Sequence, residues 1–111
     1  MKARGTLKKN SDFRRLYAKG KSAVTPYLVL YARPNRLEEN RVGYTVSVKL
    51  GHAVVRNRVR RRLREIYRLN SPRLRPGYDL VIVARSRAVG CAYQKLDAAF
   101  LHACGDLGLL L

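Results

Sequence analysis

Seven arginines gather in one short stretch of the chain, "VVRNRVRRRLREIYR", which covers residues 54–68. Glu65 is the only acidic residue among them. A guanidinium group makes paired hydrogen bonds to phosphate oxygens and also stacks on flat rings. A dense arginine cluster is therefore typical of proteins that bind phosphate-rich polymers. The seven residues are Arg56, Arg58, Arg60, Arg61, Arg62, Arg64 and Arg68.

The same stretch has the spacing of an amphipathic helix, which we expect to run from residue 53 to residue 69. Its apolar residues recur every three or four positions, so they form a stripe that can pack on a sheet. The opposite face of the helix concentrates the positive charge. The stripe consists of Val55, Val59, Leu63, Ile66 and Leu69, and the opposite face carries Arg56, Asn57, Arg60, Arg61, Arg64 and Arg68.

Three charged residues do not fit this division of the helix. Arg58 and Glu65 fall at the flanks of the apolar stripe, where they can form an ion pair. Arg62 falls inside the stripe. We expect its aliphatic stem to lie along the edge of the core and its guanidinium to reach water.

A charged helix face can simply be solvated, but such faces usually mix both signs of charge. Arginines four positions apart, such as Arg56 and Arg60, repel each other by a few tenths of a kcal/mol. The repulsion favours an anionic partner. Basic-region helices that enter DNA usually continue into leucine heptads, whereas this helix carries its own core stripe. We therefore expect RNA and not DNA.

Three aromatic residues are candidates for contacts with unstacked bases. Phe13, Tyr17 and Tyr31 have the flat rings on which single-stranded RNA is commonly held. The same rings can equally well pack in the core. The pattern of residues leaves both roles open.

The composition indicates one globular domain with a polyanionic partner. The chain has 111 residues, 47% of them hydrophobic, and its 24 Lys and Arg against 7 Asp and Glu give a formal net charge of +17. No segment approaches the run of about 18 apolar residues that a membrane helix needs, and the start lacks the apolar part of a secretory signal. We expect a cytoplasmic protein without a membrane partner, with residues 1–10 as a flexible basic arm.

The two cysteines do not have the spacing of a metal site. Cys91 and Cys104 are thirteen positions apart, and neither His52 nor His102 stands at zinc spacing to them. We expect two reduced thiols in or near the core, without a disulfide or a metal bound by the protein.

Apolar periodicity predicts three helices and three strands. The helix near residue 11 is capped by Ser11 and ends before Gly20, and Pro26 places the start of the next strand at an edge or bulge. The apolar run from Leu80 to Ala84 indicates a central strand. The expected helices cover residues 11–19, 53–69 and 93–104, and the expected strands cover residues 22–33, 41–50 and 78–86.

These elements predict an α/β or α+β fold of two layers, in the order α-β-β-α-β-α. We expect the first two strands to pair as an antiparallel hairpin, because a short polar connector joins them. The strand, helix, strand unit that follows requires a parallel pair, so the sheet is mixed, and the helices cover one face of it.

The segment "KLGHAVVRNRVRRRLREIYR", residues 49–68, resembles the signature of the protein subunit of bacterial ribonuclease P. The signature reads basic, any, Gly, any, Ala-Val, any, Arg-Asn, then further basic residues. Segments "SDFRRLYAKG", "LVLYAR", "RVGYTVS" and "YDLVIVAR" resemble other elements of the family, although Val48 stands where many members are basic. The matching positions are Lys49, Gly51, Ala53, Val54, Arg56, Asn57, Arg60, Arg61 and Arg64.

The resemblance implies more than the residue pattern does. It implies a left-handed strand, helix, strand crossover, against the general preference for right-handed connections. It implies that the protein assists removal of the 5′ leader of precursor tRNA, while a catalytic RNA subunit with Mg²⁺ at its active site supplies the chemistry. It also implies a cleft for the leader, lined by Phe13, Tyr17 and Tyr31, and contacts to the RNA subunit from Lys49, Arg56, Asn57, Arg60, Arg61, Arg64 and Arg68.

Two other classes of function compete with this one. A nuclease that works without RNA needs clustered carboxylates or paired histidines, and the acidic residues here are scattered over separate elements. A ribosomal or general RNA-binding protein could carry the same basic helix, and only the match to the signature argues against it.

Overall fold

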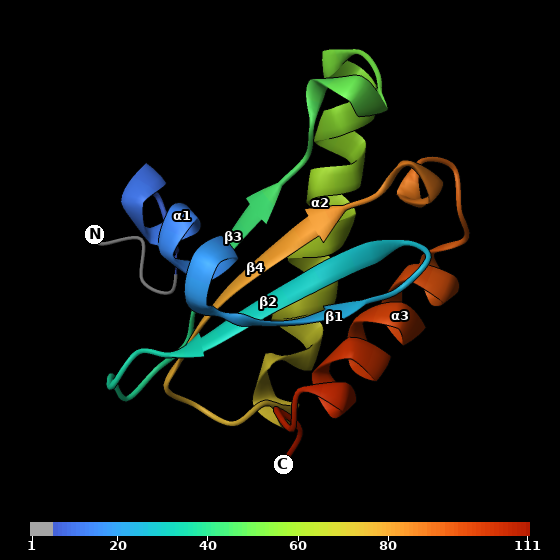
Figure 1. The fold of residues 1–111 in the computed structure, drawn as a ribbon. Helices are drawn as coiled ribbons and strands as arrows, with labels where there is room; N and C mark the ends of the chain where they lie inside the picture. Colours follow the sequence, from blue (N-terminus) through green and yellow to red (C-terminus); the bar gives the residue numbers. More distant parts are fainter. Residues whose placement is uncertain (1–5) are drawn as a thin grey trace.

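Four strands and three α-helices make up the part of the chain that the computed structural model describes, residues 6–111 (Figure 1). The order is α1-β1-β2-β3-α2-β4-α3. The elements are α1 (Asn10–Lys19), β1 (Lys21–Val24), β2 (Leu28–Pro34), β3 (Arg41–Thr45), α2 (Ala53–Asn70), β4 (Tyr78–Ala84) and α3 (Tyr93–Asp106).

The strand expected at residues 22–33 is two strands, β1 and β2, that form an antiparallel hairpin. The turn between them is built on Thr25. Its backbone N–H and its hydroxyl both donate to the carbonyl of Leu28, and the hydroxyl accepts a hydrogen bond from the N–H of Leu28. Pro26 lies in this turn and so does not interrupt a strand. The predicted element order therefore lacked one strand.

The strands form one mixed sheet in the order β1-β2-β4-β3. Strand β4 pairs antiparallel with β2 and parallel with β3. The expected parallel pair and the central position of the apolar strand are confirmed. The expected hairpin between residues 22–33 and 41–50 is wrong, because β4 inserts between these two segments. Strand β3 is consequently an edge strand.

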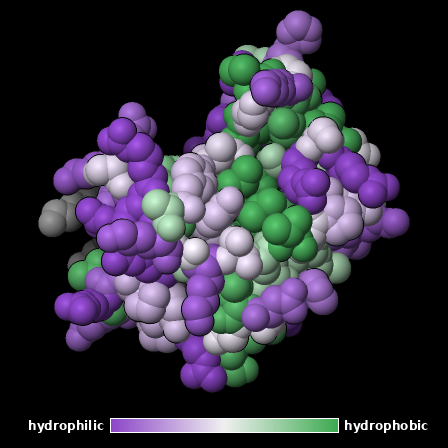
Figure 2. All heavy atoms as spheres, in the orientation of Figure 1, coloured by the Kyte–Doolittle hydropathy of each residue, from purple (hydrophilic) through white to green (hydrophobic). Residues whose placement is uncertain are grey.

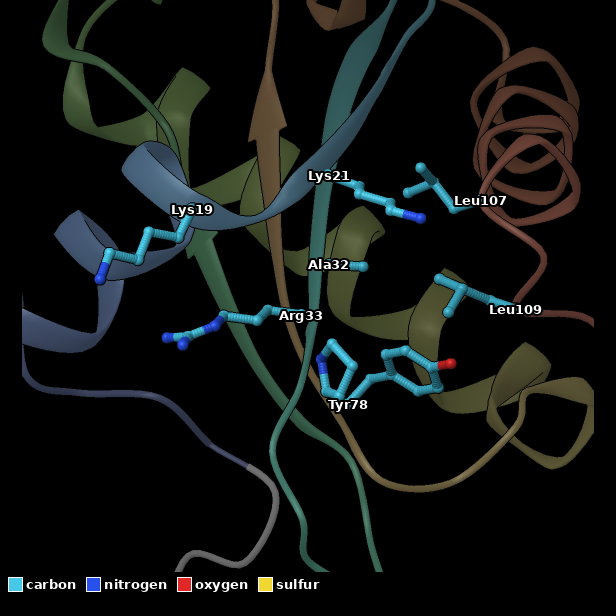
Figure 3. Close-up of a pocket in the computed structure, with 8 residues that line it drawn as sticks. Lys19, Lys21, Ala32, Arg33, Tyr78, Leu107 and Leu109 are labelled. Atoms are coloured by element: carbon cyan, nitrogen blue, oxygen red, sulfur yellow. The ribbon is translucent and has the colours of Figure 1, made fainter.

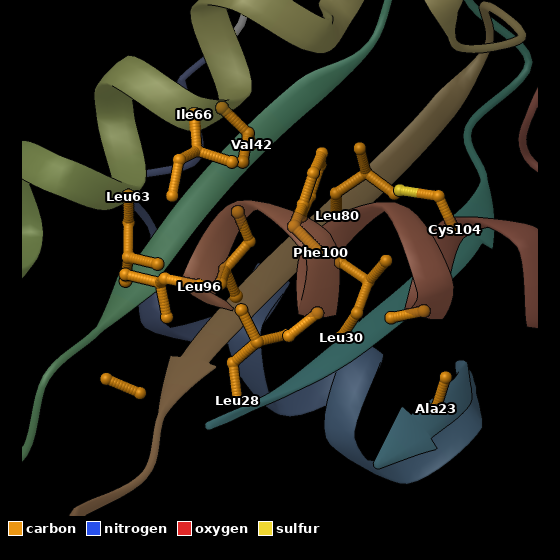
Figure 4. Close-up of a cluster of buried hydrophobic side chains, with 14 of the residues drawn as sticks. Ala23, Leu28, Leu30, Val42, Leu63, Ile66, Leu80, Leu96, Phe100 and Cys104 are labelled. Atoms are coloured by element: carbon orange, nitrogen blue, oxygen red, sulfur yellow. The ribbon is translucent and has the colours of Figure 1, made fainter. Parts of the chain in front are cut away.

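Helices α2 and α3 cover one face of the sheet and build the main core with it (Figure 4). Leu28 and Leu30 of β2 point toward this core, as do Leu80 and Ile82 of β4, because alternate residues of a strand face the same side. The buried side chains that the two helices contribute are Val59, Leu63, Ile66, Leu96, Ala99, Phe100, Ala103 and Cys104.

Helix α1 covers the other face of the sheet. Its Leu16 packs with Val81 of β4 and with Leu7, and these three side chains form a second, smaller cluster. Phe13 and Tyr31 are partly buried against it. The prediction that all helices lie on one face holds for α2 and α3 and is wrong for α1. Val81 explains the difference, since an apolar residue on the second face of a central strand also needs a cover.

The crossover from β3 through α2 to β4 is left-handed. The two strands are parallel neighbours. In Figure 1 both point upward, α2 runs behind the sheet and β4 lies to the right of β3. In a right-handed crossover with the helix behind the sheet, the second strand would lie to the left of the first. The handedness agrees with the family resemblance and departs from the general rule.

The segment that precedes α1 is held against the edge of the sheet. The N–H of Leu7 donates to the carbonyl of Val42 at 2.9 Å, Thr6 bridges to Val42, and Leu7 is 4% exposed. Thr6 and Leu7, which belong to the expected arm, are therefore held against β3. Residues 1–5 of that prediction lie outside the described part of the chain.

Helix α2 departs from its predicted pattern near its C-terminal end. Val59, Leu63 and Ile66 are buried as expected, but Leu69 is 54% exposed. Asn70 is buried in its place, and its side-chain amide donates to the carbonyl of Ile66 at 2.9 Å and to Asp97 Oδ1 at 2.7 Å. The helix is thus anchored at this end by a polar contact to α3.

Both cysteines are free thiols, as the sequence predicts. Cys104 is fully buried in the main core (Figure 4), and burial raises the pKa of its thiol from 9.0 to about 12. Cys91 is half-buried. In residues 6–111 we find no helix that is both long enough and apolar enough to span a membrane.

Candidate nucleic-acid interface

Helix α2 presents its cations on the side opposite the core, because Val59, Leu63 and Ile66 hold the other side against the sheet. We call the set Arg56, Asn57, Arg60, Arg61, Arg64 and Arg68 the arginine face. Asn57, Arg61, Arg64 and Arg68 are exposed, and Arg56 and Arg60 are half-buried. Lys49 is exposed in the short 3₁₀ turn Val48–Leu50 that leads into the helix, and Val48 beside it is 73% exposed.

Hydrogen bonds fix two of these guanidinium groups within the helix and its entry. Arg56 Nε donates to the carbonyl of Gly51 at 3.1 Å, and Arg60 Nη1 donates to Asn57 Oδ1 at 3.1 Å. The guanidinium of Arg64 lies over the ring of Tyr44, 6.0 Å from its centroid. These contacts orient the cations and leave their positive charge uncompensated.

Glu65 neutralises only one cation of the arginine face. Its carboxylate accepts two hydrogen bonds from Arg68, at 3.0 and 2.9 Å, and these bonds lower the pKa of the carboxyl. The pairing with Arg58 that the helical wheel allowed is wrong. Arg62 also differs from its expected state, because its Nη1 donates to the carbonyl of Cys91 at 2.7 Å instead of reaching only water.

A hollow of about 600 Å³ lies beside this face, between α1 and α2. Because β3 is the edge strand, the hollow continues around the edge of the sheet from one helix to the other. Figure 2 shows the surface hollowed between the hydrophilic side chains over α1 and the N-terminal end of α2. We call it the α1–α2 hollow, and it is lined by Leu7, Lys8, Asn10, Phe13, Arg14, Tyr17, Tyr44, Thr45, Val46 and Arg60.

The three aromatic candidates from the sequence form one row of rings. Phe13 and Tyr17 meet edge to face with centroids 6.5 Å apart, and Tyr17 and Tyr31 do the same at 5.0 Å. Phe13 and Tyr17 line the α1–α2 hollow, whereas Tyr31 does not and instead supports Tyr17 from β2. Tyr17 is 41% exposed, so its ring is available to a ligand.

Gly43 lets the ring of Phe13 lie directly on β3. A Cβ at this position would be 2.5 Å from Phe13 Cζ, closer than real side chains approach, and 3.2 Å from the Cβ of Leu7, which is a tight contact. The position of the Phe13 ring in the hollow therefore depends on the missing side chain at residue 43.

Sequence reasoning missed several residues of the hollow. Tyr44 was not among the candidate residues. It is half-buried against the main core, and its ring also faces Arg64 and the hollow. Burial raises the pKa of Tyr44 to about 12, and the nearby Arg64 opposes the shift. The alternation of side chains along β3 could have pointed to Tyr44, because its hydroxyl is a polar group on the apolar side of the strand. Lys8, Arg14 and Thr45 gave no signal in the sequence.

The carboxylates of the described residues lie apart and are mostly engaged with neighbouring donors. Asp79 accepts hydrogen bonds from Arg41 at 2.8 and 2.7 Å, and Asp97 accepts one from Asn70. Within residues 6–111 no three His, Cys, Asp or Glu side chains form a group that could hold a metal ion. Asp12 also forms an ion pair with Arg15 at 3.9 Å, and Asp106 lies 3.4 Å from Nε2 of His102.

A second pocket, of about 280 Å³, lies away from α2 and is not part of the interface. Figure 3 shows that its cations do not converge, because Lys19 and Arg33 point to one side of the sheet and Lys21 points to the other, toward Leu107. The remaining labelled wall residues, Ala32, Tyr78 and Leu109, lie on the side of Lys21.

Proteins of known sequence resemble the whole chain. A family model described as Ribonuclease P matches residues 1–108. A protein of Alkaliphilus oremlandii named "Ribonuclease P protein component" is 44% identical over 110 residues, which are 99% of this chain and 96% of the relative. A protein of Natranaerobius thermophilus with the same name is 50% identical over 97 residues, 87% of this chain and 84% of the relative.

Solved structures show the same fold. The RNase P protein of Staphylococcus aureus superposes with a TM-score of 0.87 at 30% identity, over 96% of this chain and 98% of the other. The RNase P protein of Thermotoga maritima gives a TM-score of 0.82 at 29% identity, over 89% of this chain and 94% of the other. The family match, the relatives and these structures together show that the chain belongs to the ribonuclease P protein family.

Proposed function

We propose that this chain binds the catalytic RNA subunit of ribonuclease P and the 5′ leader of precursor tRNA, and so assists removal of the leader. The arginine face and Lys49 would contact the RNA subunit. The α1–α2 hollow would hold the leader. Hydrolysis would take place at the RNA, with Mg²⁺ at its active site, and this chain would bind and orient without a catalytic side chain of its own. We expect the complex to work in the cytoplasm.

The observation that carries this proposal is the continuity between the two sites. Arg60 belongs to the arginine face and also lines the α1–α2 hollow with Phe13 and Tyr17. Arg60 therefore offers positive charge to a nucleic acid at the border between the outer side of α2 and the hollow. Guanidinium groups bind phosphates in such an arrangement, and aromatic rings hold unstacked bases.

The hollow has the chemistry that a single-stranded leader requires. Lys8, Arg14 and Arg60 supply positive charge at its walls, and Phe13 and Tyr17 supply ring faces. Base stacking on such rings tolerates any base, because every base has a flat face. A cleft of this kind can hold leaders of different sequence.

The test is the salt dependence of binding to a transcript of a bacterial ribonuclease P RNA subunit. With about six phosphate contacts, the affinity should fall by a factor of about 10² to 10³ between roughly 50 and 200 mM salt. The double variant Arg60→Ala and Arg64→Ala should bind at least about tenfold more weakly and should show a shallower salt slope.

The matched control is the double variant Arg73→Ala and Arg75→Ala. Both residues are exposed in the segment after α2, so the change in net charge is the same while the arginine face stays intact. Equal losses for the two double variants, or an affinity that salt leaves unchanged, would contradict the proposal. Sequencing the RNA that copurifies with the protein separates it from a general RNA-binding function, which predicts a mixture of RNAs.

A further inference from the structure

A groove of about 380 Å³, distinct from the α1–α2 hollow, lies on the side of α2 that faces α3. Arg61, Glu65 and Arg68 follow one another at helical spacing along its wall, and Tyr93 at the start of α3 forms the opposite wall. We call it the α2–α3 groove. It shares no residue with the α1–α2 hollow, and its lining residues are Arg61, Arg62, Arg64, Glu65, Arg68 and Tyr93.

Internal contacts hold two guanidinium groups of the groove in place. Arg62 donates to the carbonyl of Cys91 at 2.7 Å and so ties α2 to the segment that leads into α3. Arg68 is held by two hydrogen bonds to Glu65. Arg61, by contrast, has no hydrogen bond or ion pair with any residue between 6 and 111, and it is exposed. Arg64 has no such bond either, and its guanidinium lies over the ring of Tyr44. Among the described residues, the groove therefore has two guanidinium groups held by hydrogen bonds and two that are not.

The hydroxyl of Tyr93 is buried and has no hydrogen-bond partner among the described residues. A buried polar group without a partner is costly, so this one calls for an explanation. Burial, and next the nearby carboxylates of Asp97 and Glu65, raise the pKa of Tyr93, while Arg68 opposes the shift. The hydroxyl therefore stays protonated at neutral pH and is a hydrogen-bond donor without an acceptor among the described residues.

The charge and the walls of the groove together define the ligand. Four guanidinium groups face one carboxylate, which favours an anion. The walls between the charged heads are arginine stems and the ring of Tyr93, which suit a flat apolar body. Helix α3 begins here without a side-chain cap, so its first amide groups add partial positive charge. A nucleotide combines these properties, since it has a flat base and a phosphate.

We propose that the α2–α3 groove, which borders the arginine face and shares Arg61, Arg64 and Arg68 with it, holds one unstacked nucleotide of the RNA partner. The base would lie on the Tyr93 ring and the stem of Arg61, and the phosphate would bind the guanidinium groups of Arg61 and Arg68. The proposal rests on the proposed function, because it takes RNA as the partner. It adds a contact from α3, outside the arginine face.

A fluorescence experiment reports on the base directly. The chain has no tryptophan, so Tyr93→Trp creates a single reporter in the groove. Stacking of a base should quench its emission when a ribonuclease P RNA transcript binds. The control is Tyr27→Trp. Tyr27 also lies beside an arginine, with Arg87 at 6.0 Å from the centroid of its ring, but it lines neither the α2–α3 groove nor the α1–α2 hollow. Unchanged emission from the Tyr93→Trp variant in a complex that forms, or equal quenching in both variants, would overturn the proposal.

A pair of charge variants tests the phosphate. Arg61→Gln and Arg58→Gln remove the same charge from two exposed residues of the same helix, but only Arg61 lines the groove. We expect Arg61→Gln to weaken binding of the transcript about tenfold, and Arg58→Gln no more than about threefold. Tyr93→Phe, which keeps the ring, should bind the transcript more tightly than Tyr93→Leu. Thermal unfolding first checks that both variants are folded.

The outcomes separate the two proposals. If Arg61→Gln and Arg58→Gln bind equally well while the Arg60 and Arg64 double variant is weakened, the groove proposal fails and the proposed function stands. If all these variants bind like the unchanged protein, the proposed function fails as well.

Discussion

The hydroxyl of Tyr17 on α1 lies 2.7 Å from the hydroxyl of Thr45 on β3. This hydrogen bond joins the helix on one face of the sheet to the edge strand. It fixes the phenol end of a ring whose side meets Tyr31 at a centroid distance of 5.0 Å. The ring that the leader would contact is thus held from two directions.

Replacing Thr45 by Val should test this restraint. The shape of the side chain is kept and only the hydroxyl is lost, at a partly exposed site, so the free energy of unfolding should change by less than about 1 kcal/mol. We expect binding of precursor tRNA to weaken about twofold to fivefold, with mature tRNA unaffected. Tyr17→Phe breaks the same bond and should give the same ratio. Equal weakening of precursor and mature tRNA would argue against a role in leader binding.

Gly43→Ala should displace the Phe13 ring. The added Cβ would come within 2.5 Å of Phe13 Cζ, so the ring must move, and we expect a loss of about 1–3 kcal/mol in the free energy of unfolding. Discrimination between precursor and mature tRNA should fall as well, as it should for Phe13→Ala. Chemical denaturation and binding assays on the same preparations measure the two effects.

Gly105→Ala is the control for the glycine substitution. Its Cβ would be 3.6 Å from its nearest neighbour, Leu110 Cδ1, which is an ordinary contact, and residue 105 lies inside α3. The helix should be stabilised by up to about 1 kcal/mol. A loss of stability at Gly105 as large as at Gly43 would show that the crowding at Phe13 is not the cause.

Asn70→Ala should destabilise the junction of α2 and α3. The variant removes the amide that donates to Asp97 and to the carbonyl of Ile66, and it leaves the Asp97 carboxylate without this donor. We expect a cost of about 1–3 kcal/mol in urea unfolding. Leu69→Ala, one residue earlier at an exposed position, should cost under about 1 kcal/mol. A larger cost for Leu69→Ala than for Asn70→Ala would support the sequence prediction, in which Leu69 and not Asn70 faces the core.

The buried thiol of Cys104 should make stability depend on alkaline pH. Burial raises its pKa from 9.0 to about 12, so the folded state keeps a proton that the unfolded chain loses. The contribution of the protonated Cys104 thiol to the free energy of unfolding is complete below pH 9 and should be lost as pH rises toward about 12. Cys104→Ala should cost about 1 kcal/mol at pH 7 and flatten that decline. Cys91→Ala, which keeps Cys104, should retain the full slope in urea unfolding.

The local pattern of the sequence predicted the helices well because each helix satisfies its own periodicity. Val59, Leu63 and Ile66 face the core as the wheel required. The wheel failed one turn later, because Asn70 finds a partner on α3 that no local pattern reveals. A polar residue can take a core position when a distant residue satisfies its hydrogen bonds.

The arrangement of the strands was less predictable. A short polar connector suggested that β2 and β3 pair, but β4 lies between them. Its apolar run, which includes Leu80 and Val81, indicated a central strand, but we expected helices on only one face of the sheet. The structure adds a cover on the face that carries Val81. That cover on the second face is α1. Strand β1 was missed because its four residues, the turn at Thr25 and β2 together have the sequence pattern of one longer strand.

The candidate site was predictable in its charges and only partly in its geometry. The arginine face follows from the helical pattern alone. The meeting of Arg60 with Phe13 depends on the tertiary structure, because the two residues lie on opposite sides of the sheet edge. The α2–α3 groove depends on Tyr93, whose unsatisfied hydroxyl becomes visible only when the two helices are packed.

The uncompensated arginine face also gives the free protein and its complex opposite responses to ions. In the free protein, neighbouring guanidinium groups repel each other along α2, so dissolved salt shields them and favours the native chain. In the proposed complex with RNA, the same salt would compete for the phosphates and promote dissociation. A buffer that preserves the isolated polypeptide best is therefore a poor one for assembling the ribonucleoprotein.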